Sequence, residues 1–129
     1  MIAMLQSMVS TNDMVCYVDQ ANGNDSNDGS KDRPVKSINQ AVALANRRKF
    51  IGTAQCYIRL LSDYTIGNTS GVPDAVSLYH PDLVQNKYMY LEGWDKDTDS
   101  MTRRKIRNSP KYVTVNYKVY ILMQCCVKI

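Results

Sequence analysis

The clearest hydrophobic pattern in the chain has the spacing of an amphipathic helix. In the stretch PVKSINQAVALANRRKFIG, the apolar residues Ile38, Ala41, Val42 and Ala45 recur three and four positions apart, on one side of a helix. Ser37, with a glutamine three residues later, forms a capping box at its start. Basic residues at positions 47–49 suit the negative end of the helix dipole, and the glycine at position 52 suits a helix end. The pattern predicts one short helix over residues 37–49, with a stripe of small residues that can lie close against another element.

Elsewhere the apolar positions alternate, as in strands with one buried face. This alternation predicts strands at residues 15–19, 56–61, 74–79 and 87–94. In the last of these, Met89 and Leu91 share one face, and Tyr88 and Tyr90 share the other. Residues 112–129 alternate for most of their length and fit one long strand or two strands joined by a bend. Because no Asn-Gly or Asp-Gly pair marks a hairpin turn there, we favour two strands.

The order of these elements is a strand, a loop, one helix and then strands alone. It predicts a mainly β protein with a single domain over residues 15–129 and an N-terminal extension over residues 1–14. The strands and turns recur about every 20–25 residues, a spacing that suits a coil of a β-solenoid. A β-sandwich fits the same spacing.

The composition is that of a globular chain. The 129 residues are 44% hydrophobic and 22% charged, and the net charge is only +4. Such a mild charge does not by itself indicate a nucleic-acid-binding protein, whose basic residues usually gather on one face. The first residues, MIAMLQSMVSTND, lack the basic start and cleavage site of a signal peptide. We interpret them as a loosely ordered terminus, with an amphipathic docking segment as the alternative, and we expect no membrane span because no apolar run approaches the roughly 20 residues required.

The four cysteines do not have the spacing of a metal site. Cys16, Cys56, Cys125 and Cys126 form no C-x-x-C pair, and the only histidine, His80, is distant from all of them in sequence. Zinc sites need such residues at short spacing. Neighbours in a strand point to opposite faces, which disfavours a disulfide between the last two. We expect all four to be reduced, buried thiols, as in a protein made in a reducing cytoplasm.

The loop VCYVDQANGNDSNDGSKDRP has the composition of a calcium site. Five carboxylates lie in it or just before it: Asp13, Asp19, Asp25, Asp28 and Asp32. The pattern Asn24-x-Ser26-x-Asp28-Gly29 resembles the first half of an EF-hand loop, but the twelfth position is Val35, where a bidentate glutamate is needed. Asn, Asp and Gly also favour tight turns. The turn interpretation is therefore preferred, and Ca²⁺ binding by the loop stays the alternative.

Catalytic candidates are few and carry no motif. A pair of carboxylates with a cation could be drawn from the set Glu92, Asp95, Asp97, Asp99, Arg103 and Arg104. Glycosidases need two carboxylates at a set separation, and an Asp-rich run is more often a solvated loop. His80, in His-Pro-Asp at a strand end, has no nucleophile motif beside it and is interpreted as a turn residue. We expect no enzyme activity, no catalytic residues, no cofactor and no metal site.

Two further features could contact a partner. The basic stretch TRRKIRNSPK, residues 102–111, could contact a phosphate-rich surface, but we interpret it as a solvated loop. A docking contact is the next alternative, and nucleic acid is the least favoured. The nine tyrosines could form a surface for a sugar or a protein partner, although strands favour tyrosine in any case.

The segment YVDQANGNDSNDGSKDRPVKSINQAVALAN resembles the N-terminal module of right-handed parallel β-helix proteins of the pectin-lyase-like superfamily, in the version found in phage tailspikes and tail fibres. The matching positions are Tyr17, Val18, Asp19, Asn27, Asp28, Gly29, Pro34, Val35, Ser37, Ile38, Ala41, Val42 and Ala45. CYIRLLSDYTI resembles the first coil, with Asp63 at a position where glycine is common. SLYHPDLVQNKYMYLEGW resembles a later coil through Leu91 and Gly93, with Met89 in place of isoleucine. The resemblance spans residues 17–94.

This resemblance implies a short right-handed parallel β-helix whose open end is covered by the helix at residues 37–49. It implies a structural component of a phage virion, of tail-fibre or tailspike type, assembled in the host cytoplasm. Self-association as a homotrimer and docking on other virion proteins are expected from it. The alternative is a carbohydrate-active or glycan-binding module that meets a host surface glycan, because one fold serves several functions.

Overall fold

The computed structural model describes residues 9–10, 12–66, 76–78, 83, 88–108, 121–123 and 126–128. The described part is mainly strand with one helix, in agreement with the mainly β prediction. The elements are β1 (Val9–Ser10), β2 (Met14–Val18), α2 (Ile38–Asn46), β3 (Lys49–Phe50), β4 (Cys56–Leu60), β5 (Tyr64–Ile66), β6 (Val76–Leu78), β7 (Tyr88–Asp95), β8 (Ser100–Met101), β9 (Ile106–Asn108), β10 (Ile121–Met123) and β11 (Cys126–Lys128).

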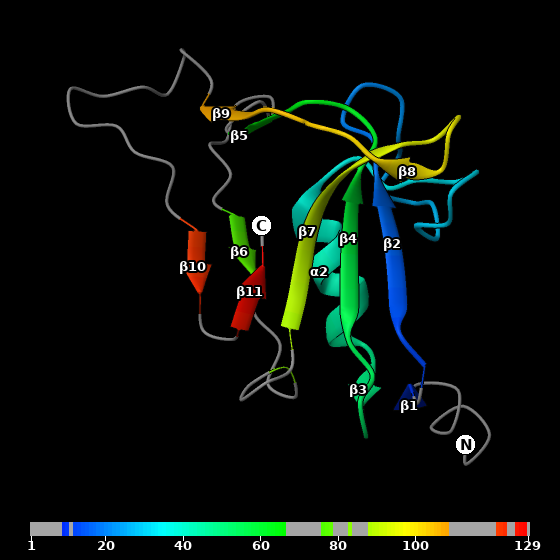
Figure 1. Ribbon diagram of the computed structural model, residues 1–129, viewed down its shortest axis with the longest axis vertical. Helices are drawn as coiled ribbons and strands as arrows, with labels where there is room; N and C mark the ends of the chain where they lie inside the picture. The colour runs from blue at the N-terminus through cyan, green and yellow to red at the C-terminus, as the bar shows by residue number, and fades with distance from the viewer. Residues whose placement is uncertain are drawn as a thin grey trace.

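Parallel pairing dominates the sheets. The main sheet has the order β11-β7-β4-β2, with all three of these pairs parallel, and its centre lies in front of α2 in Figure 1. Three two-stranded sheets, β1-β3, β5-β9 and β6-β10, are parallel as well. Among the named strands, only β8 is antiparallel, and it folds back on the end of β7. Parallel neighbours require long connections, so each return of the chain to the main sheet uses many residues.

The register of the main sheet corrects the predicted spacing. Tyr17 pairs with Arg59, 42 residues later, and Arg59 pairs with Glu92, 33 residues later. The expected recurrence of about 20–25 residues is therefore wrong for this sheet. The strand at residues 74–79 was counted in that recurrence, but β6 pairs with β10 in another sheet.

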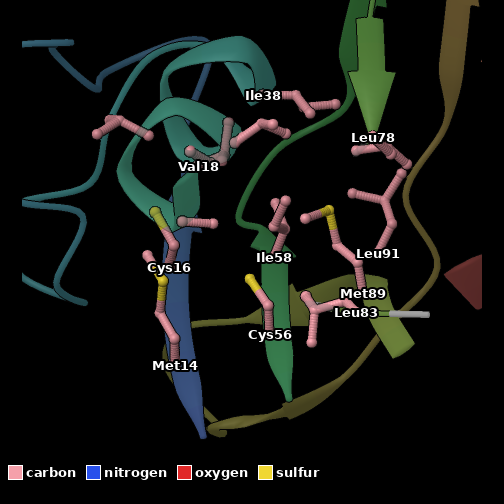
Figure 2. Packing of buried hydrophobic residues seen from close by; sticks show 14 of the residues in the cluster. Met14, Cys16, Val18, Ile38, Cys56, Ile58, Leu78, Leu83, Met89 and Leu91 are labelled. Carbon is pink, nitrogen blue, oxygen red and sulfur yellow. The ribbon is translucent and has the colours of Figure 1, made fainter. Parts of the chain in front are cut away.

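The core is formed by side chains from alternate positions of three parallel strands. β2 contributes Met14, Cys16 and Val18, and β4 contributes Cys56, Ile58 and Leu60, all of them buried. Met89 and Leu91 of β7 continue these rows, as predicted from their alternation. Figure 2 shows these columns facing Ile38 of α2 and Leu78 of β6. The core thus lies between the inner face of the main sheet and the helix, and the outer face of the sheet is left for other side chains.

The helix is shorter than predicted. It begins after Ser37 and ends at Asn46, and Ile38, Ala41, Val42 and Ala45 are buried as expected. Arg47 is the C-cap, so the basic residues follow the helix and are not in its last turn. Lys49 already belongs to β3, which pairs with β1. Gly52 has a φ of +64° but lies in the next turn, between β3 and β4, and does not end the helix.

The start of the helix is fixed by the acidic loop as well as by its own cap. Ser37 Oγ accepts a hydrogen bond from Gln40 N at 3.0 Å, which is one half of the predicted capping box. The second bond of a capping box would run from Ser37 N to the Gln40 side chain. Asp25 takes that place: its Oδ1 accepts from Lys36 N and Ser37 N at 2.9 Å each, and its Oδ2 accepts from Ser37 Oγ at 3.0 Å. A carboxylate at this end also suits the helix dipole. One aspartate of the loop therefore holds the helix onto the preceding chain.

We expect Asp25→Ala to lower the free energy of unfolding by about 1–2 kcal/mol, the usual effect of losing a helix cap. Asp25 is exposed, so the change leaves no cavity. Urea denaturation followed by circular dichroism measures it. Asp32→Ala, which changes another exposed carboxylate of the same loop, is the control and should differ from the native chain by less than about 0.5 kcal/mol. Equal effects of the two changes would contradict the anchoring role.

Two predicted boundaries also shift. The first strand begins at Met14, which is buried and pairs with Cys56, so the predicted boundary between residues 14 and 15 falls inside β2. The strand ends before Asp19, because Asp19 Oδ1 accepts from the main-chain N–H groups of Ala21 and Asn22 and turns the chain. In the final stretch, β10 and β11 are separate strands with different partners, which agrees with two strands. His80, Cys125 and residues 109–120 lie outside the described residues.

Candidate functional site

The outer face of the main sheet gathers aromatic and charged side chains. They come from outward positions of three neighbouring strands, β2, β4 and β7: Tyr17, Tyr57, Arg59, Tyr90, Glu92 and Trp94. We call this set the outer aromatic surface. The strand registers place Tyr17, Arg59 and Glu92 in one row and Tyr57 and Tyr90 in the next. In Figure 1 these strands lie side by side in front of α2, so the face of the sheet opposite the helix points toward the viewer.

Arg59 is the centre of this surface. Its guanidinium carbon lies 3.6 Å from the centre of the Trp94 ring, and its Nε lies 3.3 Å from Glu92 Oε1. Nη1 donates to Tyr17 Oη at 3.1 Å. The side chains of Arg59 and Glu92 are only 20% and 12% exposed, although they lie outside the core. The aromatic rings therefore shield an ion pair on the outer face, where its attraction is screened less than in open solvent.

Tyr57 and Tyr90 stack on each other. Their ring centroids are 4.6 Å apart and their planes differ by 7°. This separation is close to the distance between neighbouring strands, so the stack follows from the parallel register. The pKa of Tyr57 is raised, mainly by desolvation and then by the nearby Asp13. Stacked rows of this kind stabilise the sheet.

A cavity lies beside the outer aromatic surface, where β4 and β7 end. It has a volume of about 510 Å³ and is lined mainly by apolar groups, with Arg103 and Arg104 among the polar ones. Gly93 forms part of its wall, and the segment at residues 102–104 passes close against that glycine, with Thr102 N donating to Gly93 O at 3.1 Å. Arg104 Nη2 donates to Trp94 O at 2.9 Å, which links the cavity to the surface.

The predicted catalytic carboxylates do not gather at this cavity. Glu92 contributes to its lining and is paired with Arg59. Asp95 ends β7, and its Oδ1 accepts from the N–H groups of Asp97 and Thr98, so it shapes the turn to β8. Asp97 is exposed in the same turn, and the run is a hairpin turn as the loop interpretation implied.

Asp99 has a separate role in that hairpin. It has a φ of +51° and accepts from Trp94 Nε1 at 3.0 Å. It also pairs with Lys31 at 3.2 Å. The hydrogen bond from Trp94 and then that from Lys31 lower the pKa of this carboxyl. Asp99 therefore holds the tryptophan ring on the outer aromatic surface.

The acidic loop is built from turns. Asn24 Oδ1 accepts from Ser26 N and Oγ, and Asp28 Oδ1 accepts from Ser30 N at 2.9 Å. Those hydrogen bonds from Ser30 lower the pKa of Asp28. Gly29 has a φ of +83°, as expected for a tight turn. No group of three or more potential metal ligands occurs within the described residues. These contacts support the turn interpretation of the loop.

The basic stretch is only partly a loop. Ile106–Asn108 form β9 beside β5, and Asp63 Oδ1 accepts from Lys105 N at 2.9 Å. Asp63 therefore joins two strands that are distant in sequence, β5 and β9. Arg103 is exposed, whereas Arg104 lies half-buried in the cavity wall. The prediction of a solvated loop holds for Arg103 and is wrong for residues 106–108, because the parallel pairing with β5 orders them.

Cys16 and Cys56 are buried free thiols, as expected. Burial raises the pKa of the Cys16 thiol from 9.0 to about 12, although Arg48 opposes the shift. Because the pKa of Cys16 is raised in the folded state, its buried neutral thiol contributes to stability in full below pH 9. That contribution is lost as the pH rises from 9 towards 12.

We therefore expect the free energy of unfolding to fall between pH 8 and pH 10.5 by about 2 kcal/mol more in the native chain than in Cys16→Ala. Urea denaturation at each pH measures the difference. Iodoacetamide at pH 8 should label Cys16 only after unfolding, as peptide mass spectrometry would show. Rapid labelling of Cys16 in the folded protein would contradict its burial.

Comparisons of the chain with family models, curated proteins and solved structures find no match. The described residues contain no helix that is both long and apolar enough to cross a bilayer.

Sequence reasoning missed the most connected residue of the site. Arg59 was one polar position in the predicted strand at residues 56–61, and nothing local distinguishes it. Aligning the alternating strands by their outward positions would have placed it between Tyr17 and Glu92. That alignment needs the register, which the predicted spacing of about 20–25 residues did not provide.

Proposed function

We propose that this chain is a capped unit of right-handed parallel β-helix that serves as a structural and docking component of a phage virion, in an appendage of tail-fibre or tailspike type. The observation that carries the proposal is the parallel register of β2, β4, β7 and β11, with the inward side chains of the first three in columns. Columns of this kind are what stacked coils produce, since each coil contacts only its neighbours. The resemblance of residues 17–94 to the N-terminal module and the coils of that superfamily supports the same assignment.

The position of α2 agrees with a capping role. Its small-residue stripe is buried, and the helix contacts β2, β4 and β6. Its first N–H group, that of Ile38, donates to the hydroxyl of buried Tyr64 at 3.2 Å. A solenoid needs a cap because its end otherwise exposes apolar side chains and strand edges. Within the part of the chain that the structure describes, α2 is the element that can serve as that cap.

Self-association is the mode of action in this proposal. Among the described residues, β11 pairs with only Tyr88–Tyr90 of the eight-residue β7. A strand edge of this kind favours pairing with a further chain. The superfamily resemblance makes a homotrimer the expected form, and other virion proteins the further partners.

Light scattering after size exclusion tests this role with the full chain. We expect a mass of about three times the 14.6 kDa of one chain. A monomer at micromolar concentration would overturn the assembly proposal. Mass spectrometry of purified phage virions tests the location. Detection of the chain among their proteins would support it, and its absence would count against it.

A second candidate function is favoured by the outer aromatic surface. Sugar rings stack on aromatic side chains, and Arg59, Glu92 and Tyr17 supply hydrogen-bonding groups among them. A glycan-binding role would therefore use Trp94 and its neighbours. Titration with acidic and neutral oligosaccharides, followed by Trp94 fluorescence, tests it: we expect saturable quenching, and no change with either class would exclude the role.

A further inference from the structure

The cavity at the ends of β4 and β7 has the size of a small-molecule site. Its volume of about 510 Å³ falls in the range of about 300–1,000 Å³ that such sites occupy. Its apolar lining comes from four separate parts of the chain: Leu60, Leu91, Met101 and Ile106. Met101 is 67% exposed and stands at the mouth of the cavity. An apolar group of modest size would therefore find a surface there that excludes water.

Arg104 is a charged group of the cavity wall with one N–H donor, at Nε, that lacks an acceptor among the described residues. Its Nη2 donates to Trp94 O at 2.9 Å, which fixes the guanidinium in place. Its Nε is buried and has no hydrogen-bond partner among the residues that the structure describes. A buried donor of a charged group without an acceptor is costly, and a carboxylate satisfies a guanidinium better than a neutral acceptor does.

The position of this nitrogen depends on Gly93. A Cβ atom on Gly93 would lie 3.0 Å from both Arg104 Cγ and Arg104 N. Only the missing side chain lets the segment at residues 102–104 lie so close to β7. The main chain at residues 102–104, held close to Gly93, therefore places Arg104 against the wall of the cavity.

The charge around the cavity favours an anion. Arg103 and Arg104 both line it, and the carboxylate of Glu92 is engaged by Arg59 at 3.3 Å. We propose that this cavity binds a small organic anion with an apolar body. Its carboxylate pairs with the guanidinium groups of Arg103 and Arg104 at the cavity wall, and its hydrocarbon part lies against Leu60, Leu91 and Ile106. This inference does not depend on the assembly role, because every residue it uses belongs to one chain.

Sodium octanoate is a suitable probe, since it combines a carboxylate with a short hydrocarbon chain. Binding is measured by calorimetry and by ¹⁵N chemical-shift changes at Gly93 and at residues 101–106 of the full chain. We expect saturable binding of octanoate, and binding at least about tenfold weaker for acetate, which lacks the chain, and for 1-octanol, which lacks the charge. Absence of octanoate binding, or equal binding of all three, would overturn the proposal.

Two pairs of variants test the role of charge. Arg104→Met keeps an apolar side chain and should weaken octanoate binding by about 10- to 100-fold, the usual value of a hydrogen bond to a charged group. Lys105→Met removes a neighbouring positive charge outside the cavity lining and should leave binding within about twofold. Equal effects of the two changes would assign the binding to general charge and reject the site.

The second pair avoids any risk of misfolding. Met101 is exposed, so Met101→Glu and Met101→Gln should both fold and differ only in charge at the mouth. We expect Met101→Glu to bind octanoate several-fold more weakly than Met101→Gln, because like charges repel. The same affinity in both variants would contradict an anionic ligand.

Discussion

Gly93→Ala is expected to lower the free energy of unfolding by about 3 kcal/mol, at the upper end of the range for overpacking. The added Cβ would lie 2.1 Å from Thr102 O, which is a main-chain atom and cannot rotate away. To relieve the contact, the segment at residues 102–104 must move away from β7. That movement breaks the bond from Thr102 N to Gly93 O and displaces Arg104 from the cavity wall.

Urea denaturation of the full chain measures this loss, and the amide spectrum of residues 101–106 reports the movement. Gly52→Ala is the matched control, because a Cβ there meets nothing within 4 Å although φ is +64°. It should cost only about 1 kcal/mol, the penalty for a side chain in the left-handed region. If Gly93→Ala were no more damaging than Gly52→Ala, the close approach at Gly93 would be disproved.

Arg59→Met should be the most damaging change on the outer face of the sheet, with an expected loss of about 2–3 kcal/mol. It leaves the carboxylate of Glu92, which is only 12% exposed, without its cation. Breaking a buried pair costs about 3–5 kcal/mol, and we expect less here because Arg59 is 20% exposed. The stacking of the guanidinium on Trp94 at 3.6 Å is lost as well.

A double-mutant cycle separates these contributions. Arg59→Met combined with Glu92→Gln should recover about half of the loss, since no charge is then left unpaired. Lys31→Met provides the control, because it breaks an exposed ion pair with Asp99. The side chain of Lys31 is 36% exposed and that of Asp99 is 59% exposed. That change should cost less than about 1 kcal/mol. Strict additivity in the cycle would contradict an interaction between Arg59 and Glu92.

Much of the local structure could be predicted from the sequence. The apolar stripe of the helix and the alternating positions of β4 and β7 are buried as expected. The end of the helix was misplaced because a run of basic residues is equally compatible with the last turn of a helix and with the segment that follows it. The acidic loop was interpreted as a set of turns, but the bonds from Asp25 to Lys36 and Ser37 were not anticipated, since those partners lie 11 and 12 residues away.

The candidate sites were much less predictable. Glu92, Asp95, Asp97 and Asp99 were considered as candidates for a catalytic pair of carboxylates, and no catalytic role was predicted for them. The fold gives three of them different partners: Arg59 for Glu92, a turn for Asp95, and Trp94 with Lys31 for Asp99. Residues that are close in sequence within a strand and its turn need not have neighbouring side chains, because alternate residues of a strand face opposite sides of the sheet.

The sequence by itself determined which side chains are buried in α2, β4 and β7, because the periods of two and of about 3.6 are properties of the backbone that each short segment carries alone. Only the tertiary structure decided which strands are neighbours and in what register. Parallel partners 33 and 42 residues apart are selected by the packing of the whole core, and local periodicity places no limit on that distance. The Arg59 cluster and the cavity beside Arg104 exist only through that register, since each joins residues from strands that are distant in the chain.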